Sequence, residues 1–356
     1  MLVRTIVQVL IFLLAAGCFL GESSVRTFRS PVVPFHELFV LADTIRLDSS
    51  ILIGQISFLD VSDTGELLVT DDVARSVHLF SATGTHARSY LVPECLPDDM
   101  DFVPWSSRFI GDGRILTMQI GGPSALFDIE GDCLVGKRAW MMLVKSFCAR
   151  EDSIFTHKTY KVGQATTSVF SSVLEAVVDI PIDPPRLVSL NTDHLGQQGR
   201  SIDCFDDGAY YVYTESMDAI PVWSSSTRIQ YRPDFFEWRP EDLPRASPAE
   251  RSRLQMEYPS TIAIFALDRS TRMILSLDLD STWHLDDGNT SVPKGISVAS
   301  NTGKFPGRST ISPVWPMAAG NGFFYVVGEN ESLPHGEVGN PVLLKYQFIP
   351  PGDTND

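Results

Sequence analysis

Five polar side chains occupy comparable places in the chain, each at the end of an apolar run that turn residues follow. They are Asp71, His157, Glu215, Asp278 and Glu329. If each run is the second strand of a four-stranded unit, all five lie on one face of the fold. Carboxylates from separate elements can surround one cation or polar ligand, so the pattern predicts such a site, with calcium as the candidate ion. The alternative is that they are ordinary polar residues where strands meet water.

Sequence motifs of established enzyme classes are absent from the chain. The seven His residues make no HxH or HExxH pattern, and there is no GxSxG elbow, P-loop or GxGxxG turn. The SDTG turn at residues 62–65 and the DDG turn at residues 206–208 are acidic. Asp accepts local N–H groups and Gly adopts positive φ, so these residues predict turns rather than calcium loops. No catalytic residue is indicated.

The N-terminus has the pattern of an export signal. Arg4 supplies a positive charge, residues 6–16 are almost all apolar, and the segment ends in LLAAGC. An apolar segment this short is typical of a signal peptide. The ending resembles the lipobox of bacterial lipoproteins, which predicts cleavage after Gly17 and a lipid on Cys18. The alternative is an ordinary signal peptide cut at the same bond, because Ala15 and Gly17 fit a small-x-small site.

Export permits disulfides, and the sequence leaves their pairing open. With Cys18 lipidated, four cysteines remain, and their spacing allows three pairings. They are Cys95, Cys133, Cys148 and Cys204. None belongs to a CxxC motif, so neither zinc binding nor thioredoxin-like chemistry is indicated. Unpaired, buried thiols are the alternative.

The chain is strongly acidic. It has 44 Asp and Glu residues against 28 Lys and Arg, a formal net charge of −16. Such a surface repels phosphate backbones and anionic membranes, so we expect no nucleic-acid partner and membrane contact only through an N-terminal lipid. The expected partner is an envelope protein, a peptide or a small polar ligand.

From residue 36 onward, short apolar runs alternate with turn residues. The clearest unit is residues 55–92, with four runs separated by turns. Further units follow at residues 108–140, 145–190, 200–240, 261–300 and 314–349. In the unit at residues 261–300, the strand candidates in order are TIAIFAL, RMILSL, TWHLD and GISVAS. Four short strands within about forty residues is the size of one propeller blade. The sequence therefore predicts an all-β fold, a six-bladed β-propeller of four-stranded antiparallel blades over residues 36–350.

The two ends of the chain complete this domain organisation. The last unit has only three strand candidates, and residues 36–47 supply the fourth in this interpretation, which closes the ring. Residues 1–17 form the signal peptide, residues 18–35 a tether, and residues 351–356 a polar tail. One short helical insertion is expected at residues 241–257, because Ser247 and Pro248 fit a helix start.

The residues of the first unit resemble a known family. The stretch FLDVSDTGELLVTDDVARSVHLFSATG, residues 58–84, is similar to an NHL-type blade. The segments TWHLDDG and VVGENESL with PVLLKYQF resemble the closing blades of six-bladed β-propeller lipoproteins of bacteria. The resemblance covers most of residues 36–350, and residues 145–190 depart from it most. It implies a cell-surface or periplasmic module, generally without assigned chemistry.

Two functions remain open from the sequence. The first is a lipid-anchored propeller that acts as a binding or scaffold module at the cell envelope. The protein is periplasmic or extracellular instead if an ordinary signal peptidase cuts it. The alternative function is a propeller enzyme of the lactonase or lyase kind, with a divalent cation on the ring axis. No other cofactor is indicated.

Overall fold

The computed structural model describes the chain from residue 25 to residue 351, with internal gaps. The gaps are residues 97–101, 112, 120–121, 138–143, 151–152, 162–163, 172–175, 182–201, 207, 213–217, 224–227, 234–259, 278–282, 285–289, 292–293, 301–306 and 329–338. In the described part of the chain, no helix has the length and apolar character needed to cross a membrane.

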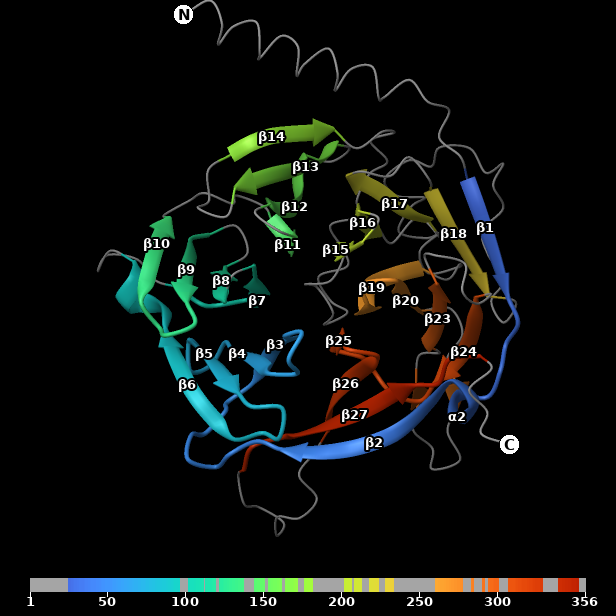
Figure 1. The fold of residues 1–356 in the computed structure, drawn as a ribbon, viewed down its shortest axis with the longest axis horizontal. Helices are drawn as coiled ribbons and strands as arrows, with labels where there is room; N and C mark the ends of the chain where they lie inside the picture. The colour runs from blue at the N-terminus through green and yellow to red at the C-terminus, as the bar shows by residue number, and fades with distance from the viewer. Residues whose placement is uncertain are drawn as a thin grey trace, which may run out of the picture.

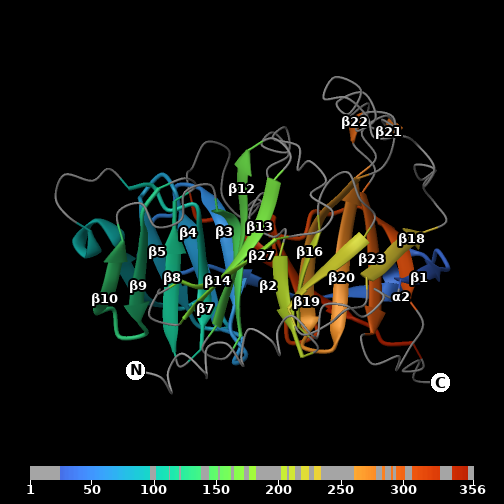
Figure 2. The same ribbon diagram turned by 90° about the horizontal axis from the view of Figure 1, so that it is seen from above.

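The protein is an all-β propeller of four-stranded antiparallel blades. Its sheets surround a central axis (Figure 1), and their strands run from one face of the ring to the other (Figure 2). We name each sheet by its innermost strand. From the axis outward, the strands are β3 (Ile56–Val61), β4 (Leu67–Asp71), β5 (Ser76–Phe80) and β6 (His86–Leu91); β7 (Ser106–Ile110), β8 (Arg114–Met118), β9 (Ser124–Asp128) and β10 (Cys133–Lys137); and β11 (Val144–Arg150), β12 (Ser153–Lys161), β13 (Gln164–Ser171) and β14 (Ala176–Pro181).

The remaining sheets follow in chain order around the axis. Their strands are β15 (Ile202–Phe205), β16 (Gly208–Val212), β17 (Asp218–Trp223), β18 (Arg228–Pro233) and β1 (Val25–Ser30); β19 (Ser260–Asp268), β20 (Thr271–Leu277), β23 (Lys294–Ser300) and β24 (Arg308–Ser312); and β25 (Ala318–Gly320), β26 (Phe323–Gly328), β27 (Val342–Phe348) and β2 (Phe39–Arg46). The inner strands contact one another in the order β3, β7, β11, β15, β19, β25 and back to β3.

Hydrophobic side chains fill the spaces between neighbouring sheets. In β4, Leu67 and Val69 pack toward the β25 sheet, and Leu68 packs toward the β7 sheet. Successive side chains of a strand point to opposite faces, so both faces of β4 are buried. Similar clusters lie between the β7 and β11 sheets, the β15 and β19 sheets, and the β19 and β25 sheets. This face-to-face packing holds each inner strand at the axis.

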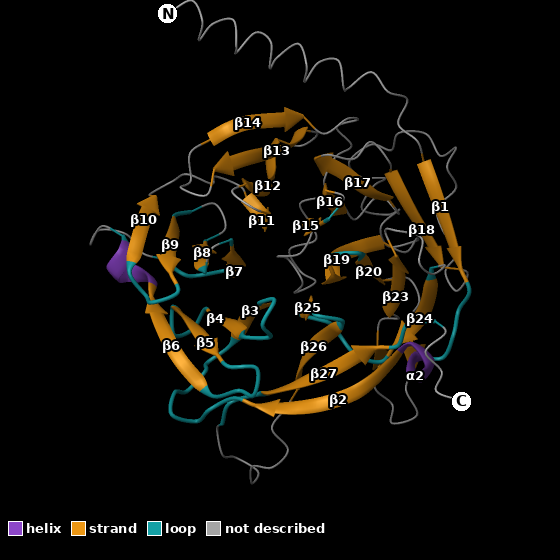
Figure 3. Ribbon diagram, in the orientation of Figure 1, coloured by secondary structure: helices purple, strands orange, loops and turns teal. Residues whose placement is uncertain are grey.

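An N-terminal segment, residues 25–47, runs along the outer edges of three sheets, and we call it the belt. Its strand β1 pairs in parallel with β18, Val32 bridges to Ser309 in β24, and β2 pairs antiparallel with β27. An uncovered edge strand presents unpaired N–H and C=O groups, so the belt satisfies edges that would otherwise be open. The short helical segments α2 (Phe35–Leu38) and η1 (Val92–Cys95) lie at the periphery (Figure 3).

The belt confirms one expectation and corrects another. Residues 36–47 do supply the outer strand of the last sheet, as β2. The predicted tether, residues 18–35, is partly strand instead, because its backbone from Val25 to Ser30 pairs with β18. Residues 1–24, including Cys18, and the predicted helix at residues 241–257 lie outside the described residues.

The strand assignment in the unit at residues 261–300 was also partly wrong. TWHLD was expected as a third blade strand, but Trp283–His284 forms strand β21, which among the described strands pairs with β22 (Thr290–Ser291) alone. This small hairpin projects from one face of the ring (Figure 2). The third blade strand is β23, whose residues after Lys294 are all buried. The fourth is β24, which lies beyond the expected end of the unit.

Candidate axial binding site

A cavity of about 970 Å³ lies where the inner strands end. Residues of all the inner strands line it, together with the turns that lead from an inner strand to the second strand of its sheet. We call the side of the ring that carries these turns the cavity face, and the other side the opposite face. Among the described residues, the lining carboxylates are Asp60, Asp63, Glu66, Asp203, Asp206 and Asp268, and the lining guanidinium groups belong to Arg108 and Arg269.

Hydrogen bonds tie four of the turns on the cavity face to one another. Asp206 donates its backbone N–H to the carbonyl of Arg269 at 3.0 Å, and Gly322 donates to the carbonyl of Leu267, next to the end of β19, at 2.7 Å. Asn321 Nδ2 donates to the carbonyl of Ser62 at 2.8 Å. We call the turns β3–β4, β15–β16, β19–β20 and β25–β26 the locked rim. Their mutual bonds hold the rim in place before any ligand arrives.

The sequence of one turn explains how the rim is positioned. Asn321 and Gly322 alone connect β25 to β26, and both have positive φ, 57° and 81°. Asn-Gly is the preferred pair for such a two-residue hairpin, because Gly has no Cβ and Asn tolerates the left-handed region. The tight turn places the Asn321 amide against the neighbouring β3–β4 turn.

An exposed ion pair joins two turns of the locked rim. Arg269 Nη2 lies 2.6 Å from Asp63 Oδ2, and both side chains are largely exposed. These residues belong to the β19 and β3 sheets, which are separated by the β25 sheet. The pair therefore bridges two sheets that are not neighbours.

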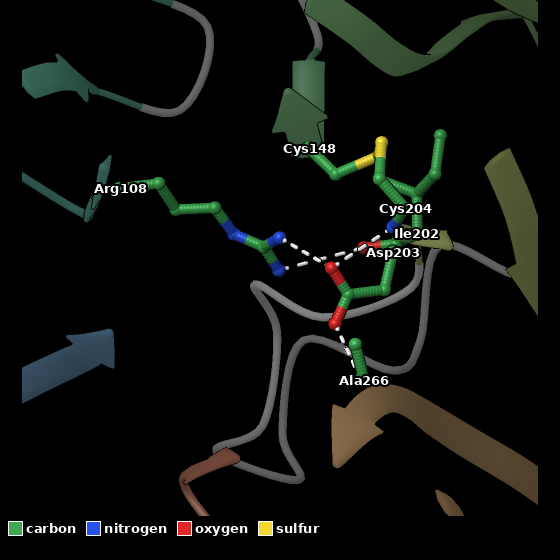
Figure 4. Close-up of a disulfide and its surroundings, with 6 residues drawn as sticks. All are labelled: Arg108, Cys148, Ile202, Asp203, Cys204 and Ala266. Carbon is green, nitrogen blue, oxygen red and sulfur yellow. Dashed lines mark hydrogen bonds and ion pairs between the residues drawn. A yellow bond between two sulfur atoms is a disulfide. The ribbon is translucent and has the colours of Figure 1, made fainter. Parts of the chain in front are cut away.

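A second, buried ion pair lies deeper along the axis. Arg108 of β7 and Asp203 of β15 approach to 2.9 Å, and their side chains are only 5% and 10% exposed. Strand β11 lies between β7 and β15, so the pair also spans non-neighbouring sheets (Figure 4). Asp203 further accepts the backbone N–H groups of Cys204 at 3.1 Å and Ala266 at 2.9 Å. A buried pair of this kind is costly to break, because removal of one charged group leaves the other buried without a partner.

The surroundings of Arg108 leave one of its donors unused by protein. The guanidinium carbon lies 5.6 Å from the ring centre of Phe58 and 5.8 Å from that of Phe147. Its Nη2 donates to the carbonyl of Ile202 at 3.4 Å. Among the described residues, its buried Nε has no hydrogen-bond partner. This nitrogen is enclosed by protein, so Arg108 acts in the structure through its bonds to Asp203 and Ile202.

One disulfide joins neighbouring sheets, and a second ties the segment η1 to an outer strand. Cys148 of β11 bonds to Cys204 of β15, beside the buried ion pair (Figure 4), and both cysteines line the cavity. Cys95 of η1 bonds to Cys133 of β10. The sequence had left three pairings open, and the structure has this one. Disulfides are consistent with an exported protein.

Asp71, the one predicted site residue whose side chain is described, is away from the cavity. It pairs with Ile56 at the start of β3, which places it on the opposite face. Its side chain is fully buried, and it accepts the backbone N–H groups of Gly54 at 2.7 Å, Gln55 at 3.3 Å and Ala74 at 2.9 Å. Here Asp71 fixes two loop segments by hydrogen bonds.

The described part of the chain does not bring the other predicted site residues together. His157 was expected at a strand end, but β12 continues to Lys161, so His157 lies within the strand, opposite Ser146 and Thr167. Its side chain is outside those described. Glu215, Asp278 and Glu329 lie outside the described residues. Convergence of the five residues on calcium or a polar ligand stays a prediction.

Sequence reasoning missed the acidic groups that line the cavity. Asp63 and Asp206 belong to the SDTG and DDG turns, which were interpreted only as backbone turns. A signal was present, because acidic residues recur in the turn that follows the first strand of several units. No sequence pattern indicated a role for Arg108, because it is a single charged residue within a short predicted strand.

Comparisons with known proteins support the fold. The fold is similar to that of a Bacteroides fragilis protein that is provisionally described as exported. The two structures superpose with a TM-score of 0.62, at 10% identity over 92% of this chain and 100% of that one. A member of the DUF4221 family from Bacteroides vulgatus gives a TM-score of 0.57, at 11% identity over 88% of this chain and 99% of that one. No family model matches the sequence. No curated protein matches it either. At these identities, the chain shares the β-propeller fold with the two Bacteroides proteins.

Proposed function

We propose that this chain is an exported six-bladed β-propeller that binds a ligand in its axial cavity and acts as a binding module. The blade count is supported by six sheets of at least four strands among the described residues. It is also supported by the closed order of contacts between their inner strands. The relationship to NHL-like bacterial lipoproteins is part of this proposal.

The observation that carries the binding role is the cavity itself. Its volume of about 970 Å³ lies at the upper end of the range for small-ligand sites. The locked rim borders it with turns that are already hydrogen-bonded to one another. A pre-formed site loses less conformational entropy when a ligand binds, which favours recognition.

A variant that fills the cavity tests this role. Ala149 lines the cavity and is half-buried, so Ala149→Trp places a large side chain there. A panel of polar small molecules and short peptides is screened by the midpoint of thermal unfolding (Tm). We expect ligands that raise the Tm of the wild type and leave that of Ala149→Trp unchanged, because a ligand stabilises only a protein that binds it.

The control for this experiment is Val40→Trp, which adds Trp at an exposed position of β2 away from the cavity. This variant should respond to ligands as the wild type does. If every ligand that stabilises the wild type also stabilises Ala149→Trp to the same extent, the axial cavity is not the binding site.

We further propose that Cys18 carries a lipid that holds the propeller at the cell envelope. The LLAAGC sequence supports this, and the two disulfides fit an exported location. The Cys18→Ala variant should move from the membrane fraction to the soluble fraction. Retention of the variant in the membrane, or a soluble wild type after export, would rule the anchor out.

A further inference from the structure

The charges that line the axial cavity are unbalanced. Among the described lining residues, six carboxylates face two guanidinium groups, a formal excess of four negative charges. Both arginines are already paired, Arg108 with Asp203 and Arg269 with Asp63. A concave surface with charge of one sign concentrates the electrostatic potential and attracts ligands of the other sign.

The carboxylates are distributed rather than gathered at one point. Glu66 comes from the β3–β4 turn, Asp206 from the β15–β16 turn, and Asp268 from the end of β19. Within the ranges that the structure describes, no three His, Cys, Asp or Glu residues are grouped so that they could hold a metal ion. Negative charge spread around a rim complements a chain that carries several positive groups better than it complements one compact ion.

The inner part of the cavity adds a different kind of group. Arg108 is nine-tenths buried or more, it lines the cavity, and its Nε has no hydrogen-bond partner among the described residues. The guanidinium is held by Asp203 and by the carbonyl of Ile202, and the Nε is enclosed by protein. A basic peptide complements the acidic rim, because its Lys and Arg side chains carry several positive charges along one chain.

We propose that the axial cavity binds a basic peptide segment. Its positive side chains contact the carboxylates of the locked rim. This inference rests on the proposed binding role and names the ligand class for the same cavity. The volume of about 970 Å³ has room for several residues of a peptide.

The test is binding of a fluorescently labelled tetralysine peptide to the purified exported protein, measured by anisotropy. Tetraglutamine and tetraglutamate are the neutral and acidic control peptides. We expect tetralysine to bind at least about tenfold more tightly than tetraglutamine, with an affinity that falls as salt is added, because charge attraction is screened. Ala149→Trp should abolish this binding.

Paired variants separate the cavity charges from the net charge of the protein. Asp206→Asn with Asp268→Asn removes two carboxylates from the cavity and keeps an acceptor oxygen at each position. Glu37→Gln with Asp43→Asn removes two exposed carboxylates from the belt. We expect the cavity pair to weaken tetralysine binding at least about tenfold, and the belt pair to change it less than about twofold. Glu66→Gln is the second cavity variant if the first pair has a lowered Tm.

The outcomes distinguish the two levels of the proposal. If tetraglutamine binds as tightly as tetralysine and Ala149→Trp abolishes both, the cavity binds a ligand but the basic class is wrong. If tetralysine binds Ala149→Trp unchanged, or if both paired variants weaken binding equally, the peptide does not use the cavity and the inference is overturned. Full competition by one equivalent of calcium overturns it as well, in favour of a metal site.

Discussion

The two faces of the ring place their carboxylates in different surroundings. On the opposite face, the Asp71 carboxylate is fully buried and accepts three backbone N–H groups. On the cavity face, Asp63 and Asp206 lie exposed at the rim, and their turns are tied together by backbone groups and by the Asn321 amide. Rim carboxylates are thus accessible to a ligand, whereas Asp71 is committed to structure. The same residue type therefore fixes loops on one face and is exposed at the rim on the other.

The largest effect should come from the buried ion pair of the cavity. Asp203→Ala leaves the Arg108 guanidinium buried without its partner and removes the acceptor of the Ala266 N–H group. We expect the free energy of unfolding to fall by about 3–5 kcal/mol, measured by chemical denaturation. The double variant Arg108→Met with Asp203→Leu should recover much of this loss, since it leaves no buried charge without a partner. Equal loss in the single and double variants would contradict this account.

A second effect tests whether Asp71 is structural. Asp71→Ala removes the acceptor of the N–H groups of Gly54, Gln55 and Ala74. We expect a loss of about 2–4 kcal/mol in the free energy of unfolding, because buried donors are left unsatisfied. Binding in the axial cavity should be unchanged, since Asp71 lies on the other face. If Asp71→Ala weakened binding in the cavity without lowering the free energy of unfolding, Asp71 would act on the site and not on stability.

The fold was predictable from the sequence where a blade is built from short local hairpins. Strands β3 to β6 fall within the predicted unit at residues 55–92, because SDTG and SATG mark hairpin turns between buried apolar runs. The TWHLD segment was wrongly predicted as a blade strand, because a strand-like composition does not show which apolar runs pair within a blade. The third strand of that blade is β23, whose residues after Lys294 are all buried.

The candidate site was less predictable, because it depends on distances across the ring. The pairing of Arg108 with Asp203 joins residues 95 positions apart in the sequence and in sheets that are not neighbours. No local pattern contains that information. The acidic turns were visible, but their arrangement around one cavity follows only from the packing of the sheets.

A smaller effect involves His78, which lies within β5 between the two faces. Its ring nitrogens are each 2.8 Å from a hydroxyl oxygen, of Ser76 and of Ser89. Burial lowers the pKa of His78 below its ordinary value of 6.5; Asp71 acts in the opposite direction, and His86 lowers the pKa further. The unfolded chain therefore binds this proton more readily than the folded protein does. Stability is complete above the unfolded pKa and is lost as the pH falls through the folded pKa.

The measurement for His78 is the Tm between about pH 8 and pH 5. We expect the wild type to lose stability toward acid, and His78→Gln to lose less of it, since Gln does not titrate. His36→Gln, at an exposed position of α2, is the control. Identical acid dependence in the wild type and in His78→Gln would show that other groups determine the decline.

The smallest effect on stability should come from the exposed ion pair of the locked rim. The Asp63 and Arg269 side chains are 78% and 73% exposed, so water and salt screen their attraction. We expect Asp63→Asn to change the free energy of unfolding by less than about 1 kcal/mol, in contrast to Asp203→Ala. The turns keep their positions through the bond from Asn321 to Ser62 and the bond from Asp206 to Arg269. A loss as large as that of Asp203→Ala would show that the ion pair, rather than these hydrogen bonds, holds the rim together.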